Sequence, residues 1–382
     1  MSPDRIGEEP LMNINLNKED MKRLMALSDI RITNEDIISM YAEYIINHSK
    51  HITKELIEDF NGDGYFSEEE AYYYLFLAAC GFDIEKYENH REIARSYIHP
   101  SIKKLDTAKY SNNPYYKNIK IPNKKVGTWE LKEETFQPYE AFLCDDVYVD
   151  DKFREIPRLG FFSESFSFPA VLENNNEWMT ITPSELESSQ EAIDKAFGKV
   201  ITYGLGLGYY AYMVSEKENV ESITVIERDK AVIDLFETYI LPQFTHKEKV
   251  KIINCDAFDY DTTKENYDFA FVDIWHDAGD GFELYLKMKA IENPNIQYSY
   301  WIEESLLTVL RKYVLLALIQ ELDTTKAAPA QSLKGDSVYD EYLKIQSAIK
   351  ENLKNTAITS YDDITYYLSN PFLKKLAKNL LR

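Results

Sequence analysis

The stretch Lys199-Val-Ile-Thr-Tyr-Gly-Leu-Gly-Leu-Gly208 decides the fold of this chain. An apolar strand runs into three alternating glycines, Gly204, Gly206 and Gly208. Such a turn lets the backbone pass close to a ligand, because a Cβ at those positions would collide with it. A helix is predicted to begin at about Tyr209 and to present its N-terminal N–H groups. Taken alone, the glycine pattern is a weak signal, since any tight strand-to-helix connection favours glycine.

Three strands predicted downstream of this turn each end in an acidic residue. The strand predicted over Glu221–Glu227 ends in Glu227, and the strand over Tyr267–Asp273 ends in Asp273. The strand over Val250–Cys255 is followed by Asp256. Alternating strands and helices predict a parallel sheet, whose carboxyl edge is where ligands bind. Glu227 follows the glycines by about 20 residues, where a carboxylate can accept both ribose hydroxyl hydrogens. The alternative is a solvated charge, or a cap for a helix over Asp229–Phe244.

Together, residues 199–303 resemble a class I S-adenosylmethionine-dependent methyltransferase domain, and specifically its spermidine synthase branch. The shared motifs are Val-Ile-x-x-Gly-x-Gly, Ile-Glu-x-Asp after the second strand and Tyr-Asp-x-x-x-Val-Asp at the fourth. The preceding Trp178-Met-Thr-Ile-Thr-Pro-Ser-Glu185 resembles the hairpin and helix that lead into that domain. The resemblance implies a Rossmann-like, doubly wound fold and S-adenosylmethionine, or a derivative such as its decarboxylated form, as cofactor.

The resemblance also implies roles for individual residues. Gly204, Gly206 and Gly208 would face the methionine part of the cofactor. Glu227 would hold the ribose, and Asp256 with the Ala257 backbone would read the adenine edge. Asp273 would lie beside the reacting sulfonium and the incoming nucleophile.

The chain departs from polyamine synthases in four places. Leu207 stands where they carry an acid in the glycine loop, and their lead-in tyrosine has no counterpart among residues 187–190. Their paired acids lie three apart, whereas Asp273 and Asp277 are four apart. After a fifth strand over about Gln297–Glu303 the usual closing hairpin is hard to find. Methyl transfer is therefore favoured over aminopropyl transfer.

The segment Asp273-Ile-Trp-His-Asp-Ala-Gly-Asp-Gly281 lies where a substrate would meet the cofactor. For an amine substrate, Asp273 or His276 could accept the proton, while Asp277 and Asp280 attract the cation and Trp275 offers a flat wall. The alternative hypothesis is that His276 and Asp277 cap a helix beginning near Gly281, and that Trp275 only packs.

A calcium-type loop is predicted in the first part of the chain. Residues 59–70, Asp-Phe-Asn-Gly-Asp-Gly-Tyr-Phe-Ser-Glu-Glu-Glu, fit the twelve-residue EF-hand pattern and resemble EF-hand and dockerin loops. The predicted ligands are Asp59, Asn61, Asp63, Tyr65 through its carbonyl, and bidentate Glu70. Asn-Gly-Asp-Gly is also a good turn, and Ser67-x-x-Glu70 is a helix capping box by itself. A structural Ca²⁺ is favoured over a sensor, and an unpaired loop is a reason to look for a homodimer.

The predicted fold class is α/β: a Rossmann-like domain with helical and β-rich additions. Residues 1–125 are predicted as a helical domain carrying the EF-hand-like loop, with Asn34 as N-cap of a helix over Glu35–Ile46 and Tyr110–Lys125 as a linker. Residues 126–190 are predicted as a β-rich lead-in, with strands over Thr128–Phe136, Ala141–Val149 and Trp178–Thr182. Residues 191–322 form the cofactor domain and 323–382 a helical extension with a loop near 326–336.

The composition narrows the range of partners. With 43 Lys and Arg against 65 Asp and Glu, the net charge is −22, which repels phosphate backbones and anionic lipids. We therefore expect no nucleic-acid or membrane partner, but a small-molecule, cationic amine substrate. Three dispersed cysteines and a polar N-terminus predict a cytoplasmic setting.

Three hypotheses follow from the sequence. The first is an S-adenosylmethionine-dependent transferase. The second is a catalytically silent protein that keeps the nucleoside pocket and binds a partner through its acidic surface or EF-hand-like domain. The third, a nicotinamide-dependent oxidoreductase, explains Glu227 but not Asp256, Ala257 and Asp273, and ranks last.

Overall fold

The computed structural model describes residues 12–322 and 337–381 of the chain, which divides into two compact units. The larger unit comprises Asn34–Ile274 and Asn293–Glu303. The smaller unit comprises Met1–Thr33, Trp275–Glu292 and Glu304–Arg382.

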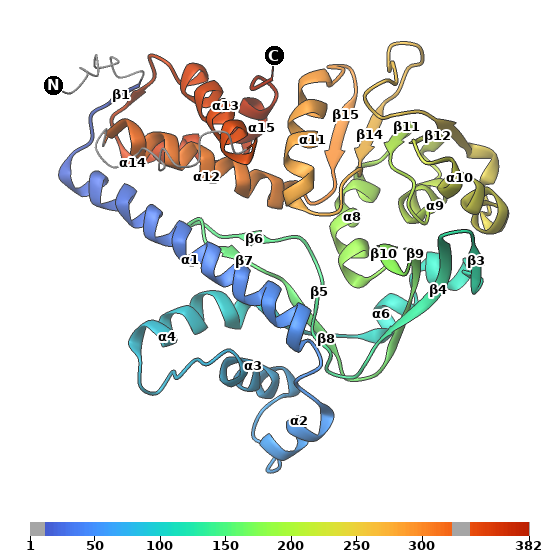
Figure 1. Ribbon diagram of the computed structural model, residues 1–382, viewed down its shortest axis with the longest axis horizontal. Helices are drawn as coiled ribbons and strands as arrows, with labels where there is room; N and C mark the ends of the chain where they lie inside the picture. The colour runs from blue at the N-terminus through green and yellow to red at the C-terminus, as the bar shows by residue number, and fades with distance from the viewer. Residues whose placement is uncertain (1–11, 323–336, 382) are drawn as a thin grey trace. The chain divides into compact units, whose positions relative to one another are not determined.

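A five-stranded parallel sheet belongs to the larger unit (Figure 1). Its strands are β11 (Gly198–Tyr203), β12 (Val220–Glu227), β13 (Val250–Asn254), β14 (Phe269–Val272) and β15 (Gln297–Tyr300). The spatial order is β13-β12-β11-β14-β15, so successive strands are added on one side of β11 and then on the other. The predicted α/β class with a parallel sheet is confirmed. A switch point of this kind leaves a crevice at the carboxyl ends of the two central strands.

Helical segments of the larger unit precede β11 and connect β11, β12 and β13. They are α8 (Pro183–Lys195), α9 (Tyr209–Ser215), α10 (Lys230–Leu235), the π-helical η2 (Phe236–Ile240) and the 3₁₀ segments η3 (Leu241–Gln243) and η4 (Lys247–Lys249). The helix predicted over Asp229–Phe244 is confirmed as one continuous run from Lys230 to Gln243, which changes from α to π to 3₁₀ geometry along its length. Pro242 in η3 has no N–H to continue the ladder, which accounts for the end of the run. Asp229 caps α10 by accepting from Ala231 N at 2.7 Å.

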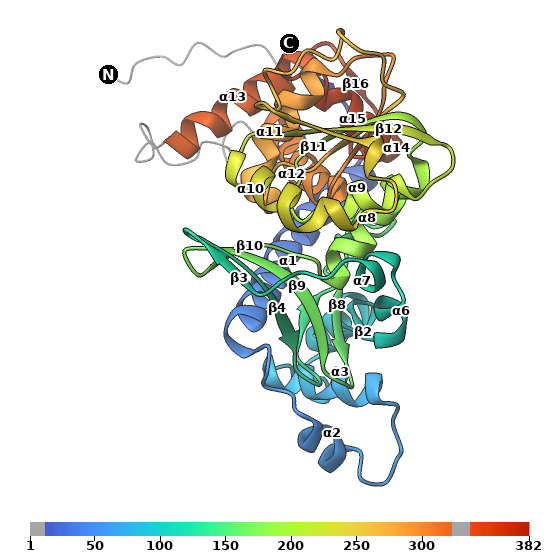
Figure 2. The ribbon, with the colours of Figure 1, turned by 90° about the vertical axis from the view of Figure 1, so that its right-hand side faces the viewer.

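An antiparallel sheet precedes the parallel one in the sequence (Figure 2). Its strands, in spatial order, are β10 (Asn176–Thr180), β9 (Phe166–Glu173), β4 (Trp129–Phe136) and β3 (Lys124–Val126). The strands predicted over Thr128–Phe136 and Trp178–Thr182 are confirmed. The strand predicted over Ala141–Val149 is wrong as one element, because it divides into β5 (Phe142–Leu143) and β6 (Tyr148–Val149).

Two smaller sheets complete the β structure of the larger unit. β5 pairs with β8 (Leu159–Phe162), which also pairs with β2 (Ile102–Leu105). β6 pairs with β7 (Glu155–Ile156) in an antiparallel hairpin.

The segment predicted as a linker contributes to the core instead. Residues 107–118 form α6 (Thr107–Ser111) and α7 (Pro114–Asn118). Tyr115 of α7 is fully buried, and its hydroxyl donates to Leu207 O at 2.6 Å. One hydrophobic cluster contains buried residues from Tyr110 to Phe271, so the predicted boundaries at 125/126 and 190/191 lie within it.

The N-terminal helices differ from the prediction at Asn34. The elements are α1 (Lys18–His48), α2 (Lys54–Phe60), α3 (Glu68–Ala79), α4 (Glu88–Ile93), the π-helical η1 (Ala94–Ile98) and α5 (His99–Ser101). Asn34 lies inside α1 rather than at its start, so the predicted cap is wrong. Its buried side chain donates to Phe153 O at 3.0 Å and accepts from Tyr97 Oη at 2.9 Å. These tertiary hydrogen bonds satisfy the side-chain amide of Asn34, which the sequence predicted as a helix N-cap.

The smaller unit is mainly helical. Its elements are α11 (Ala278–Ile291), α12 (Glu303–Leu322, which begins at the unit boundary), α13 (Ser337–Asn352), α14 (Tyr361–Tyr367), α15 (Asn370–Ala377) and the parallel pair β1 (Asn13–Ile14) and β16 (Ala357–Ile358). Arg311 is buried and donates to Leu368 O at 3.0 Å and to Glu304 at 3.0 Å. The loop predicted near 326–336 lies outside the described residues. No helix within residues 12–322 and 337–381 has the length and apolar character that a membrane crossing requires.

Candidate functional site

The carboxyl edge of the parallel sheet brings together the glycine turn and the predicted acids. Glu227 ends β12, Asp256 follows β13 by two residues and Asp273 directly follows β14. Because β11 lies between β12 and β14, the turn has Glu227 and Asp256 on one side and Asp273 on the other. The structure therefore places all three acids along one rim, as their positions after the strands predicted.

The glycine turn is shaped by contacts with the protein itself. Gly204, Gly206 and Gly208 all have positive φ, at 95°, 50° and 75°. A Cβ on Gly204 would lie 1.8 Å from the carbonyl oxygen of Asp273, and one on Gly206 would lie 1.9 Å from Met179 Sδ. A Cβ on Gly208 would lie 2.2 Å from the Phe236 ring. The sequence prediction placed a ligand against these positions, whereas protein atoms already require glycine there. Contact with the methionine part of a cofactor stays a prediction.

Glu227 is tied to the turn by hydrogen bonds. One carboxylate oxygen accepts from Leu205 N at 3.1 Å, and the other accepts from Asp229 N at 2.7 Å. Burial raises the pKa of Glu227 above its usual value, while these backbone bonds act in the opposite direction. Each oxygen retains a second lone pair, so the carboxylate can still accept from the hydroxyls of a ribose.

Asp256 and Ala257 present a hydrogen-bond acceptor and a donor side by side: the carboxylate of Asp256 accepts, and the N–H of Ala257 donates. Asp256 Oδ1 accepts from Phe258 N at 2.9 Å, which leaves Oδ2 without a hydrogen bond to the described residues. The Ala257 N–H likewise has no partner within residues 12–322 and 337–381. An adenine edge offers an amino donor and a ring-nitrogen acceptor, and this pair matches both.

Asp273 has a second, buried acid as its neighbour. Glu185 on α8 is 7% exposed, and Ser189 Oγ lies 3.5 Å from its carboxylate. Burial raises the pKa of Glu185 well above its usual value, and the negative charge of Asp273 raises it further. The Asp273 N–H donates to Tyr203 O at 2.9 Å, so the backbone of Asp273 is hydrogen-bonded to the last residue of β11. The raised pKa favours the protonated form of Glu185.

His276 and Asp277 belong to the start of α11 in the smaller unit. Asp277 is the N-cap, and its carboxylate accepts from Gly279 N at 2.6 Å and Asp280 N at 3.2 Å. His276 Nδ1 lies 2.9 Å from Asp280 Oδ2. Trp275 is 5% exposed and packs against Gly281, where a Cβ would approach its ring to 2.6 Å. The capping alternative is confirmed, although the helix begins at Ala278. A catalytic role for His276 and Asp277 stays a prediction.

The calcium-type loop joins α2 and α3 of the larger unit (Figure 1). Ser67 and Glu70 form the capping box of α3, with Ser67 N donating to Glu70 at 2.8 Å. Asn61 Oδ1 accepts from Phe66 N at 2.9 Å, and Gly64 has a φ of 66° that suits the sharp turn.

The predicted ligands of this loop are not gathered around one point. Among the described residues, no three His, Cys, Asp or Glu side chains converge in a way that could hold a metal ion. Of the predicted donors, Asn61 is used by the turn and Glu70 by the cap of α3. The capping box predicted as the alternative is confirmed, and Ca²⁺ binding stays a prediction.

Sequence reasoning missed two residues of the rim. Met179 on β10 covers the glycine turn, with its sulfur 3.3 Å from Leu207 N. Glu185 is the acid beside Asp273. Glu185 carried a usable signal, since an acid on the apolar face of a predicted helix requires a reason for burial. Met179 carried none, because its contact depends on the register shift between Glu177 and Met179.

Comparison with known proteins gives a family match for part of the chain. Residues 192–289 match the Spermine/spermidine synthase domain family. None of the curated proteins matches this chain. Two solved structures are similar over part of their length. A protein of Thermoplasma acidophilum described as a methyltransferase has 21% identity, a TM-score of 0.21 and coverage of 27% of this chain and 42% of that chain. The spermidine synthase of Thermotoga maritima has 16% identity, a TM-score of 0.26 and coverage of 35% and 49%.

The chain thus spans less than half the length of these two structures. The family match contains the glycine turn, Glu227, Asp256 and Asp273. Residues 192–289 accordingly form a domain similar to that of the spermine and spermidine synthases.

Proposed function

We propose that this protein is a group transferase that uses S-adenosylmethionine, or its decarboxylated form, and favours methyl transfer to an amine. The observation that carries the proposal is the rim of the parallel sheet. There, Glu227 is bonded to the glycine turn, and Asp256 and Asp273 lie on opposite sides of it.

The residues of this rim suit an adenosyl sulfonium. Glu227 would hold the ribose hydroxyls, and Asp256 Oδ2 with the Ala257 N–H would hold the adenine edge. When bound, the cofactor supplies a sulfonium carbon from which a thioether departs as the acceptor nitrogen bonds to it. The contribution of the protein to such a displacement is mainly orientation and a deprotonated nucleophile.

Asp273 would serve the acceptor amine. An alkylammonium must lose a proton before its nitrogen can attack, and an ionised carboxylate at this place can both attract the cation and take the proton. With Glu185 protonated the pair would carry one negative charge, and the raised pKa of Glu185 favours this state because two adjacent carboxylates resist ionising together. The catalytic roles that the sequence predicts for His276 and Asp277, which belong to the smaller unit, stay predictions.

Leu207 supports methyl over aminopropyl transfer. This residue is 2% exposed and occupies the place in the glycine turn where polyamine synthases carry an acid. An acid there would repel the carboxylate of S-adenosylmethionine, which the decarboxylated form lacks. The apolar side chain removes that repulsion.

Calorimetric titration of the full chain with S-adenosylmethionine and its decarboxylated form tests the cofactor. A Glu227→Ala variant should bind about tenfold more weakly or worse, because hydrogen bonds to a charged group contribute about 1.5–3 kcal/mol. Glu221→Ala is the matched control, since this exposed acid lies on the same strand near its other end. Full binding by Glu227→Ala would remove the ribose assignment, and binding of NAD alone would overturn the proposal.

Turnover distinguishes the transferase from a silent binding protein. The wild-type chain should transfer the labelled methyl group of S-adenosylmethionine to at least one of a panel of primary amines, and Asp273→Asn should abolish this transfer while it retains adenosyl binding. Tight adenosyl binding with no transfer to any amine would instead favour the silent protein.

A further inference from the structure

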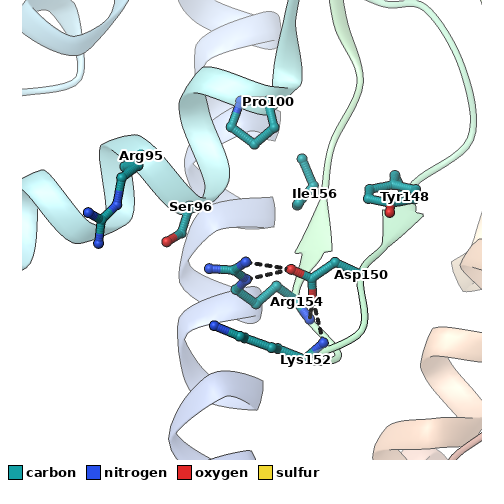
Figure 3. Close-up of a pocket in the computed structure, with 8 residues that line it drawn as sticks. All are labelled: Arg95, Ser96, Pro100, Tyr148, Asp150, Lys152, Arg154 and Ile156. Atoms are coloured by element: carbon teal, nitrogen blue, oxygen red, sulfur yellow. Dashed lines mark hydrogen bonds and ion pairs between the residues drawn. The ribbon is translucent and has the colours of Figure 1, made fainter.

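A pocket of about 480 Å³ in the larger unit shares no residue with the rim of the parallel sheet. It lies between η1 with the start of α5 on one side and the β6–β7 hairpin on the other (Figure 3). The lining residues are Arg95, Ser96, Pro100, Tyr148, Asp150, Lys152, Arg154 and Ile156. Three of these eight are cations and one is an acid, in a chain whose net charge is −22.

Asp150 pairs with one of the three cations that line the pocket and leaves the other two. Arg154 pairs with Asp150, with Nε and Nη2 at 2.7 and 2.6 Å from Oδ2. The side chains of Arg95 and Lys152 form no ion pair or hydrogen bond within residues 12–322 and 337–381. In Figure 3 the Ser96 hydroxyl points to the same side as the cationic groups of Arg154 and Lys152. The lining therefore offers a net positive charge of two and a hydroxyl donor.

Buried hydrogen bonds hold the two walls of the pocket in place. Asn34, which is 3% exposed, accepts from Tyr97 Oη of η1 at 2.9 Å and from Glu155 N of β7 at 3.2 Å. It also donates to Phe153 O in the hairpin turn at 3.0 Å. The Asn34 side chain thus connects η1 to the β6–β7 hairpin. These hydrogen bonds fix the backbone segments that carry the cations relative to each other.

The hairpin turn that carries Lys152 is itself well defined. Asp150 Oδ1 accepts from Lys152 N at 2.9 Å and from Arg154 N at 3.0 Å. Phe153 N donates to Asp150 O at 3.0 Å, and Phe153 has a φ of 62°. Asp150 is therefore used by the turn and by Arg154, and does not neutralise Lys152.

The rest of the lining is apolar. Ile156 is 3% exposed, and Pro100 and the Tyr148 ring complete the wall. The Arg158 guanidinium, which also pairs with Asp145 at 4.0 Å, lies 5.6 Å from the centre of the Tyr148 ring. The volume falls within the range of small-molecule sites, roughly 300–1,000 Å³, and exceeds what a bare inorganic anion fills.

We propose that this pocket binds a small organic anion. Lys152 and the Ser96 hydroxyl hold its phosphate or carboxylate group, Arg95 adds positive charge at the edge of the pocket, and Ile156 and Tyr148 contact its apolar part. The site is separate from the proposed transferase rim and does not depend on it.

Calorimetric titration of the full chain with three small aromatic probes tests the pocket. Phenyl phosphate and benzoate supply the two anionic groups, and benzyl alcohol supplies the ring without charge. At least one anion should bind with a dissociation constant below about 10 mM, and at least tenfold more tightly than benzyl alcohol. The preference between the two anions identifies whether a phosphate or a carboxylate is the group recognised.

A charge-matched pair of variants separates the pocket from general attraction. Arg95→Gln with Lys152→Gln should weaken anion binding tenfold or more. Lys54→Gln with Lys251→Gln removes two exposed cations elsewhere in the larger unit and should leave anion binding unchanged. Equal loss in both double variants, equal binding of benzyl alcohol, or no anion binding in the wild type would each overturn the proposal. Binding of S-adenosylmethionine should be the same in the wild type and both double variants.

Discussion

Gly204 and Gly206 differ in what surrounds the position of an added side chain. At Gly204, with a φ of 95°, a Cβ would meet the backbone carbonyl of Asp273, which cannot move without disturbing β14. At Gly206, with a φ of 50°, it would meet the far end of the flexible Met179 side chain. The same substitution should therefore have unequal effects at two positions of one turn.

We expect Gly204→Ala to lower the free energy of unfolding by about 3 kcal/mol or more, and Gly206→Ala by about 1–2 kcal/mol. Urea denaturation measures both, and Gly62→Ala, whose Cβ would meet nothing nearer than 3.7 Å, should cost less than either. Equal losses at 204 and 206 would show that the Met179 side chain cannot move aside more easily than the Asp273 carbonyl.

Glu185 should make stability depend on pH. Burial, and then the charge of Asp273, raise its folded-state pKa above the unfolded value of about 4.5, so the folded state retains the proton longer. The contribution of this group is fully present below pH 4.5 and is lost as the pH rises through the folded-state pKa. Glu185→Gln, which cannot ionise, should flatten this fall when unfolding is followed between about pH 5 and 9. A parallel pH profile in wild type and variant would show that Glu185 does not titrate in this range.

The positions of Glu227, Asp256 and Asp273 could be predicted because each follows an apolar strand, and the ends of parallel strands share an edge. The contacts of Met179 and Glu185 could not be predicted, since they join β10 and α8 to the rim through tertiary packing. Local pattern therefore identified the strand ends but not the residues packed over them.

At the scale of elements, α3 depends on its first turn. The Ser67 hydroxyl accepts from Glu70 N at 3.2 Å, and Glu70 returns the bond to Ser67 N. Ser67→Ala should lower the free energy of unfolding by about 1 kcal/mol, measured by thermal or urea denaturation. Ser39→Ala is the comparison, because Ser39 is exposed inside α1 and its side chain forms no hydrogen bond with the described residues. A neutral Ser67→Ala would show that this capping box contributes nothing to stability.

Calcium binding to the same loop remains a separate prediction. Terbium luminescence excited through Tyr65 would report a bound ion, and Glu70→Gln should abolish the signal. To bind an ion, Glu70 must leave Ser67 and Asn61 must leave Phe66, so binding competes with existing bonds. Luminescence that survives Glu70→Gln would remove the predicted ligand set.

Elements were predictable where one residue type settles the local conformation, as with Ser67 before α3 and Gly81, whose φ is 77°, after it. They were not predictable where distant residues supply the partner. Asn34 has the composition of a cap, yet its bonds go to residues 97, 153 and 155 of the chain. Tyr115 lies in a polar stretch, yet its ring is buried by packing against α9.

Over the whole molecule, the charge of −22 should limit stability at low ionic strength. Self-repulsion of the acids falls as the Debye length shortens from about 30 Å at 0.01 M to about 8 Å at 0.15 M salt. The melting temperature should therefore rise by a few degrees between these concentrations of sodium chloride, with a chelator present to exclude calcium. Potassium chloride should act equally, and a flat or falling melting temperature would contradict the argument.

Because Glu227 holds Leu205 N, Met179 faces Leu207 N and Tyr115 holds Leu207 O, the loop above β11 is ordered by folding alone. Its conformational entropy is lost when the chain folds, and a docking molecule has no disordered segment to immobilise. The Leu207 N–H now faces the Met179 sulfur, which is a weak hydrogen-bond acceptor. The affinity of a ligand at this loop should then depend on how well its own polar groups accept a hydrogen bond from Leu207 N.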